Sequence, residues 1–132
     1  MKFLFVCKHN RFRSRVASAY YNRLNRKTKN GAISAGIYLD NSSLDKNEVK
    51  ISKSFGIDIR GKPRKVNEKM LKWQNLIIIV ADDVKKSQIK NYKNYKIIIW
   101  KIKDVDNTKN VKLAIKETIK EIIKRVDTFN KR

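Results

Sequence analysis

The hydrophobic positions of the chain alternate between short continuous runs and longer periodic segments. Four short runs are mostly apolar and have the length of buried strands: 3–7, 32–36, 76–80 and 97–100. Between them, apolar side chains recur every three or four residues, as they do on one face of a helix. The segments with this helical pattern are 14–24, 44–55, 66–73, 84–92 and 111–129. The chain is therefore expected to alternate strands and helices.

This alternation predicts an α/β fold. Parallel strands joined by right-handed helical crossovers give a central four-stranded sheet with helices on both faces, a three-layer sandwich of the flavodoxin-like or Rossmann-like kind. With 132 residues and no linker or repeat, residues 1–132 are expected to form a single domain. Ligands of such sheets bind beyond the carboxyl ends of the strands. The loops that follow the strands predicted at 3–7, 76–80 and 97–100 are therefore expected to form the site.

The loop after the first strand has the composition of an anion-binding site. Cys7 ends the strand, five residues follow, and Arg13 and Ser14 open the next helix. Amides at a helix N-terminus point their N–H groups into the loop, and the helix dipole favours negative charge there. The guanidinium of an arginine can bind a phosphate group through two parallel hydrogen bonds. A cysteine in this position is a candidate thiolate nucleophile.

Phosphate-ester chemistry also needs an acid that protonates the leaving oxygen. Asp104 and Asp106 both lie in the loop after the fourth predicted strand, and either of them can approach the cysteine from there. Asp82 and Asp83 follow the third predicted strand. These two aspartates either end that strand or help to orient the loops of the site.

Five segments, in order along the chain, match a known pattern. They are Val-Cys-x-x-Asn-x-x-Arg-Ser at 6–14, Ser-Ala-Gly at 34–36, Phe-Gly-Ile-Asp at 55–58, an aspartate at 82 and Trp-x-x-x-Asp at 100–104. With these segments the sequence resembles the low-molecular-weight protein tyrosine phosphatase family, which includes arsenate reductases. The resemblance implies a sheet with strand order 2-1-3-4 and a reaction through a phosphocysteine intermediate.

The resemblance also implies roles for individual residues. Cys7 would be the nucleophile, Arg13 would bind the phosphoryl group, and Ser14 would stabilise the thiolate. Asn10 would brace the loop through its side chain. Asp104 would protonate the leaving oxygen and then activate water, with the second aspartate of its loop as the alternative acid. The residues of the phosphate-binding loop would be Lys8, His9, Asn10, Arg11, Phe12, Arg13 and Ser14.

Three positions depart from the family pattern. His9 stands where a glycine is common, so a residue with a β-carbon would have to make a tight turn. Arg15 replaces the usual proline after Arg-Ser, and Val105 replaces the proline after the general acid. The loop is therefore expected to hold its shape without any internal glycine.

Three functions remain open from the sequence. The leading hypothesis is a phosphatase that acts on phosphorylated proteins or small aryl phosphates and takes phosphate, sulfate or vanadate as pocket ligands. The second is an arsenate reductase, but thioredoxin-coupled reductases of this fold use additional cysteines. Because Cys7 is the only cysteine, such a reductase would need an external thiol. The third is a basic module that keeps the anion pocket and binds nucleic acid or a phosphoprotein with weak catalysis.

Charge and hydropathy limit the partners. Lysine and arginine outnumber acidic residues by 33 to 12, and the resulting net charge of +21 attracts polyanions. The basic residues are spread along the chain, and an A/T-rich genome would also enrich lysine, so the charge is either functional or compositional. No apolar run is long enough to cross a bilayer and no signal peptide is recognised, so we expect a cytoplasmic protein without a membrane partner.

The remaining candidates concern cofactors and the pocket wall. His9 is the only histidine, so a metal site built on histidines is not supported, and the proposed chemistry requires no metal or other cofactor. Arg11 and Tyr38 either form the wall of a pocket for an aryl group or lie at the surface.

Overall fold

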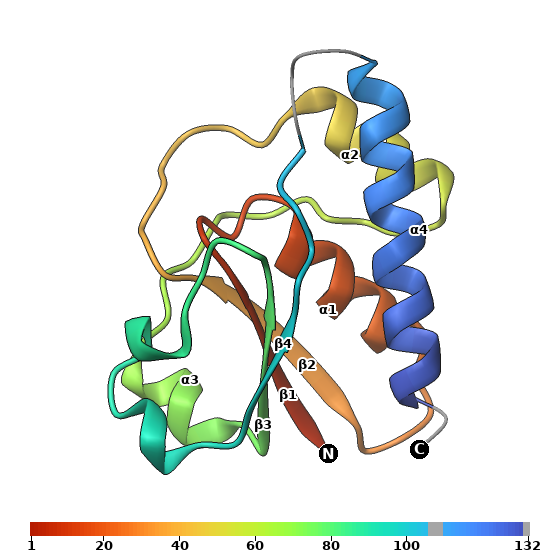
Figure 1. The fold of residues 1–132 in the computed structure, drawn as a ribbon. Helices are drawn as coiled ribbons and strands as arrows, with labels where there is room; N and C mark the ends of the chain where they lie inside the picture. The colour runs from red at the N-terminus through yellow and green to blue at the C-terminus, as the bar shows by residue number, and fades with distance from the viewer. Residues whose placement is uncertain (106–109, 131–132) are drawn as a thin grey trace.

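The computed structural model describes residues 1–105 and 110–130 (Figure 1). Its elements, in chain order, are β1 (Lys2–Cys7), α1 (Arg13–Leu24), β2 (Gly31–Gly36), α2 (Lys46–Ser54), α3 (Glu68–Trp73), β3 (Leu76–Val80), the 3-10 turns η1 (Lys86–Gln88) and η2 (Tyr92–Asn94), β4 (Ile97–Trp100) and α4 (Val111–Asn130). In Figure 1 the N-terminus lies at the lower end of the sheet, and the loop between β1 and α1 lies at the upper end.

The four strands in the described part of the chain form one parallel sheet in the order β2-β1-β3-β4. Phe5 of β1 lies beside Ser34 of β2 and Ile78 of β3, and Ile78 in turn lies beside Ile98 of β4. Every residue of β3 is buried, which explains its uninterrupted apolar sequence. The predicted α/β fold and its strand order are therefore confirmed.

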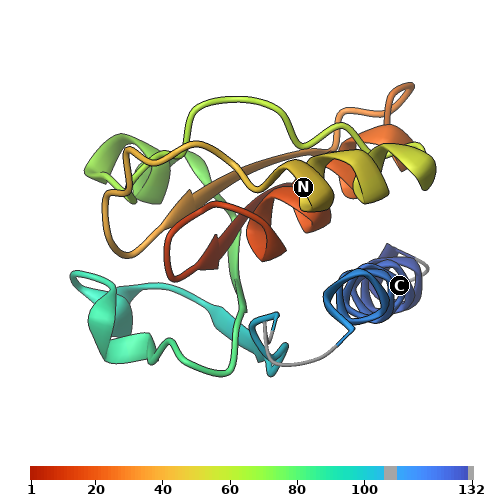
Figure 2. The ribbon, with the colours of Figure 1, turned by 90° about the horizontal axis from the view of Figure 1, so that it is seen from above.

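Helices cover both faces of the sheet. Seen from above, α1, α2 and α4 lie on one side of it, and α3 with the two 3-10 turns lies on the other (Figure 2). The first face buries Phe5 and Ile78 against α1 and α4, whereas the second buries Leu4 and Ile77 against α3. Neighbouring strand residues alternate between the two cores because strand side chains point in opposite directions in turn. The three-layer arrangement predicted from the sequence is confirmed.

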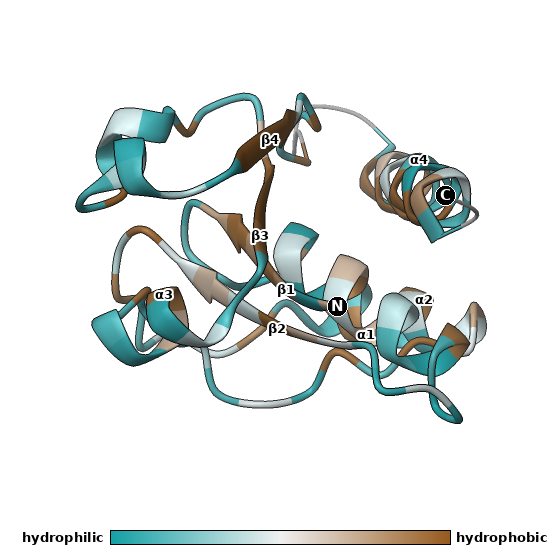
Figure 3. Ribbon diagram, turned by 90° about the horizontal axis from the view of Figure 1, so that it is seen from below, coloured by the Kyte–Doolittle hydropathy of each residue, from teal (hydrophilic) through white to brown (hydrophobic). Residues whose placement is uncertain are grey.

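The long predicted helix near the end of the chain is present as α4. Its side chains at Ile115, Ile119 and Ile122 are fully buried, and Val126 is 1% exposed, so the apolar stripe of the sequence is the face that packs on the sheet layer. Figure 3 shows β3 and β4 as apolar throughout, while α4 has both apolar and polar residues. None of the helices in residues 1–105 and 110–130 is long and apolar enough to cross a membrane.

Local sequence signals mark both ends of α2. The Oδ1 atom of Asp45 accepts a hydrogen bond of 2.9 Å from the backbone N–H of Glu48, so the helix begins at Lys46 and not at the predicted Leu44. Gly56 follows the helix with a φ of 74°, the left-handed conformation expected of a glycine after a helix C-terminus.

The helix predicted for residues 84–92 is wrong. This segment contains the 3-10 turn η1, leads into η2, and has Asn91 in the left-handed region with a φ of 60°. Val84 and Ile89 are both buried against the α3 side of the sheet, but they are five positions apart, a spacing that does not repeat along one face of an α-helix. Two separate apolar contacts therefore hold an irregular segment on the sheet.

Candidate active site

A cavity of about 190 Å³ lies where the loops after β1 and β4 meet the start of α2. Its lining residues are Cys7, His9, Arg11, Phe12, Arg13, Asp45, Glu48, Asp104 and Val105. The three residues predicted to carry the chemistry thus line one cavity, although they come from two distant parts of the sequence. They are Cys7, Arg13 and Asp104. The other predicted loop residues, Lys8, Asn10 and Ser14, are not among those that line it.

The sulfur of Cys7 has a hydroxyl group beside it. Cys7 is 2% exposed, and its Sγ lies 3.0 Å from Oγ of Ser14 in the first turn of α1. The amide Nδ2 of Asn10 donates to the same Ser14 Oγ at 2.9 Å, which leaves the hydroxyl hydrogen of Ser14 available to the sulfur. A thiolate can only accept hydrogen bonds, and the Ser14 hydroxyl is placed to donate one to it.

Asn10 is fully buried and uses both ends of its side-chain amide. Nδ2 donates to Ser14 and to Oγ of Ser34, the latter at 3.0 Å. Oδ1 accepts from the backbone N–H of Arg64 at 2.9 Å and from Nη1 of Arg15 at 3.2 Å. Because both groups that reach Oδ1 are donors, the orientation of the amide is fixed by its partners. Asn10 therefore connects the loop to β2, to α1 and to the segment before α3.

The tight turn expected at His9 lies one residue later. The left-handed backbone conformation belongs to Asn10, with a φ of 54°, and asparagine tolerates this region better than most residues that have a side chain.

A glycine is nevertheless needed, and it comes from outside the loop. A Cβ atom on Gly36 at the end of β2 would lie only 2.7 Å from the backbone N of Asn10 and 2.7 Å from the backbone C of His9. The expectation of a loop without internal glycine agrees with the structure, but its close packing depends on Gly36, the last residue of the Ser-Ala-Gly segment.

Arg15 is buried, with 9% of its surface exposed, in the position where the family pattern has proline. Its Nε donates to the carbonyl of Ile59 at 2.7 Å, and its Nη1 reaches Oδ1 of Asn10 and the carbonyl of Lys62, each at 3.2 Å. Burial, and then the charge of Arg64, lower the pKa of Arg15. The sequence analysis noted the missing proline but not this bracing role, because a hydrophobic pattern does not reveal a buried arginine.

Arg13 is held by the loops after β3 and β4. It is 4% exposed, its Nη1 donates to the carbonyl of Ile102 at 3.0 Å, and the same Nη1 lies 3.1 Å from Oδ1 of Asp83. The carboxylate of Asp82 is farther away, at 3.9 Å. The two aspartates after β3 therefore do more than end a strand, and Asp83 is the nearer partner of the guanidinium.

The start of α1 borders the cavity through Phe12 and Arg13. Phe12, at the N-cap position, makes no side-chain hydrogen bond to the N–H groups of that turn, and its ring is buried in the core. Residues that usually occupy this position satisfy those N–H groups themselves. No side chain at the N-cap position therefore occupies the N–H groups of this turn, which is compatible with the anion site expected from the sequence.

Asp104 lines the cavity from the loop after β4, and its Oδ1 accepts a hydrogen bond of 2.9 Å from the N–H of Val105. The alternative acid, Asp106, lies outside the described residues.

The predicted pocket wall is partly present. Arg11 lines the cavity, and its Nη2 donates to the carbonyl of Ser43 at 2.6 Å while its Nε lies 3.9 Å from Asp40. Tyr38 does not line the cavity, but its ring centre lies 5.9 Å from that of His9, which does. Tyr38 is 47% exposed.

Glu48 is a lining residue that the sequence analysis missed. Glu48 belongs to α2, and the apolar pattern of this helix predicted only which of its faces packs on the core. Burial raises the pKa of Glu48 to about 7, with smaller contributions in the same direction from Asp45 and Asp104, while Arg11 and Arg13 act against them. The cavity thus contains a carboxyl group that changes its charge near neutral pH.

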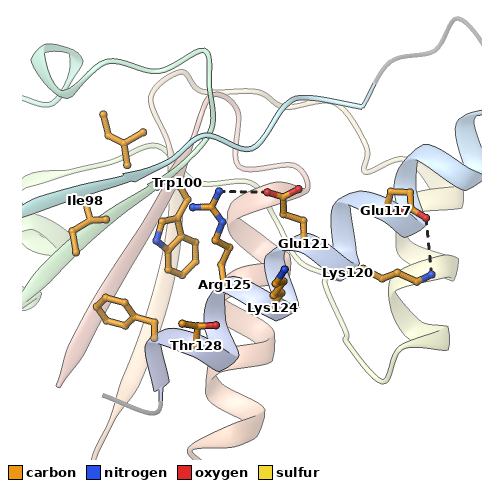
Figure 4. A pocket seen from close by; sticks show the side chains of 10 residues that line it. Ile98, Trp100, Glu117, Lys120, Glu121, Lys124, Arg125 and Thr128 are labelled. Carbon is orange, nitrogen blue, oxygen red and sulfur yellow. Dashed lines mark hydrogen bonds and ion pairs between the residues drawn. The ribbon is translucent and has the colours of Figure 1, made fainter.

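A larger hollow of about 730 Å³ lies between β4 and α4 (Figure 4). It is lined by Trp100 and by charged side chains of α4, of which Glu121 and Arg125 form an ion pair of 3.4 Å. No cysteine lines it, so it offers no counterpart to the chemistry around Cys7. Within residues 1–105 and 110–130, no group of three or more His, Cys, Asp or Glu side chains could hold a metal ion.

Comparison with protein families decides the relationship. The model of the family described as "Low molecular weight phosphotyrosine protein phosphatase" matches residues 2–127. The chain belongs to this family. The membership predicted from the motifs, and with it the assignment to a family of cysteine-dependent phosphatases, is confirmed.

Solved structures agree with this assignment to the low-molecular-weight phosphatases. The low molecular weight protein tyrosine phosphatase from T. tengcongensis is 25% identical, with a TM-score of 0.78 over 99% of this chain and 98% of that one. Wzb of Vibrio vulnificus, solved with benzylphosphonate, is 17% identical, with a TM-score of 0.80 over 98% and 97%.

A thioredoxin-dependent arsenate reductase of Corynebacterium glutamicum shares the fold as well. It is 23% identical, with a TM-score of 0.73 over 98% of this chain and 60% of that one. No curated protein sequence matches the chain. The fold therefore occurs in both phosphatases and reductases, and the choice between the two activities depends on the residues of the site.

Proposed function

We propose that the protein hydrolyses phosphate monoesters of phosphotyrosine or similar aryl groups through a phosphocysteine intermediate. The observation that carries the proposal is the cavity in which Cys7, Arg13 and Asp104 meet at the N-terminus of α1. These three residues supply the nucleophile, the phosphate ligand and the acid that the reaction requires.

In the first step, the thiolate of Cys7 attacks phosphorus, and an S–P bond forms as the P–O bond to the leaving group breaks. Arg13 and the amides of the first turn of α1 hold the non-bridging oxygens and stabilise their charge. Asp104 transfers its proton to the leaving oxygen, so the alcohol departs neutral.

In the second step, Asp104 acts as a carboxylate and takes a proton from water. The water oxygen attacks phosphorus, the S–P bond breaks, and inorganic phosphate and the Cys7 thiolate are formed. The hydroxyl of Ser14, placed 3.0 Å from the sulfur, stabilises the thiolate as it leaves. The acid is thereby protonated again for the next substrate.

The rim of the cavity supports an aromatic substrate. Arg11 and His9 line the cavity, and the ring of Tyr38 lies beside that of His9, with 5.9 Å between the ring centres. The structure of Vibrio vulnificus Wzb with benzylphosphonate provides an aromatic phosphonate in a similar fold, and we extend that ligand class to this chain.

Arsenate reduction is less well supported by the residues. Cys7 is the only cysteine in the sequence, so an arsenic adduct on its sulfur could not be resolved by an internal disulfide. A reductase built on this chain would need an external thiol for every turnover. Hydrolysis returns the thiolate with water alone.

Replacement of the nucleophile tests the proposed chemistry. Cys7→Ser should lower kcat for an aryl phosphate by about 10⁴-fold or more, because a serine hydroxyl is a far weaker nucleophile than a thiolate. Anion binding should persist, since Arg13 and the amides of α1 are unchanged. Turnover is measured with an aryl phosphate, and anion binding by calorimetry with sulfate. Retained turnover would contradict the phosphocysteine mechanism, and salt-dependent nucleic-acid binding without any turnover in the parent would favour the basic binding module.

A second substitution pair identifies the acid. Asp104→Asn should lower kcat by about 10²–10⁴-fold for an ester with a poor leaving group, and by much less for one whose leaving group needs no proton. Asp106→Asn, which makes the same change two positions along the chain, is the matched control and should retain near-parental activity. If Asp104→Asn retained parental rates, the role would not belong to Asp104, and a loss in Asp106→Asn alone would assign it to Asp106.

A further inference from the structure

Three carboxyl side chains line the small cavity that contains Cys7: Asp45, Glu48 and Asp104. The chemistry proposed above uses Asp104. Asp45 has a structural task, because its Oδ1 caps α2 by accepting the backbone N–H of Glu48. Glu48 takes part in that cap only through its backbone, so its carboxyl group has no part in either task.

The surroundings of Glu48 hold its carboxyl group near the point of ionisation. Burial and the two other carboxylates favour the protonated form, while the cations of Arg11 and Arg13 favour the ionised form. The remaining titratable groups that line the cavity are His9 and Cys7. The balance places the pKa of Glu48 at about 7, so both forms are populated near neutral pH.

The two forms of Glu48 should interact with a bound anion in opposite ways. A phosphoryl dianion on the α1 amides shares a cavity of about 190 Å³ with this side chain. A protonated carboxyl group is a hydrogen-bond donor and can bind an anion oxygen. An ionised carboxylate in the same small cavity repels the dianion, and partial burial keeps solvent from screening the repulsion fully.

Building on the proposed anion-binding function, we propose that Glu48 is a substrate-facing residue that controls the affinity of the site for dianions. In its protonated form it donates a hydrogen bond to the anion, and in its ionised form it opposes binding. Anion affinity is therefore full at mildly acidic pH and falls as the pH rises through the neutral range.

Sulfate is the appropriate probe, because it remains a dianion throughout the neutral range whereas phosphate does not. Measurements in the Cys7→Ser background remove the titration of the thiol, and His9 is common to all variants. In that background the Kd for sulfate should rise about tenfold between about pH 6 and about pH 8. With Glu48→Gln the rise in Kd over the same range should be several-fold smaller than in the Cys7→Ser parent, because the amide keeps a donor and has no charge to gain, while any contribution from His9 is the same in both.

Glu68→Gln in the same background is the matched control. Glu68 lies on α3, is 77% exposed and does not line the cavity, so its removal should leave the parental pH dependence of sulfate binding unchanged. Parallel curves for Glu48→Gln and the control would overturn the proposal for Glu48 while leaving the phosphatase proposal intact. Absence of sulfate binding in every variant at every pH would overturn both.

Discussion

Two single residues, Asn10 and Gly36, determine the shape of the phosphate-binding loop. Asn10 accepts the left-handed backbone conformation and joins the loop to three other segments through its amide. Gly36 leaves room for the loop backbone, since any β-carbon there would overlap with it. Neither residue lines the cavity, and both contact the loop that follows Cys7 or form part of it.

The importance of Gly36 can be tested against a second glycine of the same strand. Gly36→Ala should lower the free energy of unfolding by about 2–4 kcal/mol. The added Cβ would overlap with backbone atoms, which cannot rotate away as the end of a side chain can. Gly31→Ala should change it by less than about 0.5 kcal/mol, since nothing lies within 4 Å of a Cβ there and its φ is not in the left-handed region. Urea denaturation measures both, and aryl phosphatase activity should fall about tenfold or more in Gly36→Ala only. Equal free energies of unfolding for the two variants would show that the loop backbone can shift away from the added Cβ without loss of stability.

At the scale of elements, the site is assembled from the ends of strands that lie side by side. β1 ends in Cys7, the loop after β3 supplies Asp83, and the loop after β4 supplies Asp104. Arg13 joins these ends, because it belongs to α1 and contacts the loops after both β3 and β4. The parallel sheet therefore brings together residues that are about 100 positions apart in the sequence.

The contribution of the loop after β3 can be isolated with two neighbouring substitutions. Asp83→Asn should lower kcat/KM by about tenfold, because the guanidinium of Arg13 loses its nearest ionised partner and is less firmly oriented. Asp82→Asn should lower it by less than about twofold, since that carboxylate lies 3.9 Å from Arg13 and is 41% exposed. Both changes remove one negative charge, so the general electrostatic effect on an anionic substrate is matched. Equal effects would mean that the carbonyl of Ile102 alone orients Arg13.

At the scale of the whole molecule, burial explains which features the sequence predicted. The strands are almost wholly apolar and α4 has a continuous apolar stripe, so these elements could be located from hydropathy alone. The strand order came from the family resemblance, which rests on motifs and not on periodicity. The segment 84–92 was misassigned because only a few apolar residues mark it, and two of them, Val84 and Ile89, are buried by an irregular segment that needs no helical spacing.

The placement of Cys7, Arg13 and Asp104 around one cavity was predictable because these residue types imply their own chemistry, and their roles stay predictions. Arg15, Gly36 and Glu48 acquire their importance only from what the folded chain places beside them. No local pattern indicates that a buried arginine will meet a distant carbonyl, or that a polar residue of α2 will face the cavity.

The net charge of +21 is a property of the whole molecule, because the basic residues are spread along the chain. Its sign favours the approach of phosphorylated and other anionic partners. Attraction of polyanions remains a prediction.

The bracing by Arg15 links parts of the molecule that would otherwise fluctuate separately. Its hydrogen bonds join the phosphate-binding loop, through Asn10, to the carbonyls of Ile59 and Lys62. Opening the segment 59–62 would leave the buried guanidinium without two of its acceptors, so the two regions are expected to open as one unit. Amide hydrogen exchange in the segment should therefore slow down together with that of the catalytic loop when an anion binds, although the segment does not touch the anion. A proline in this position would stiffen the helix start but could not transmit such an effect.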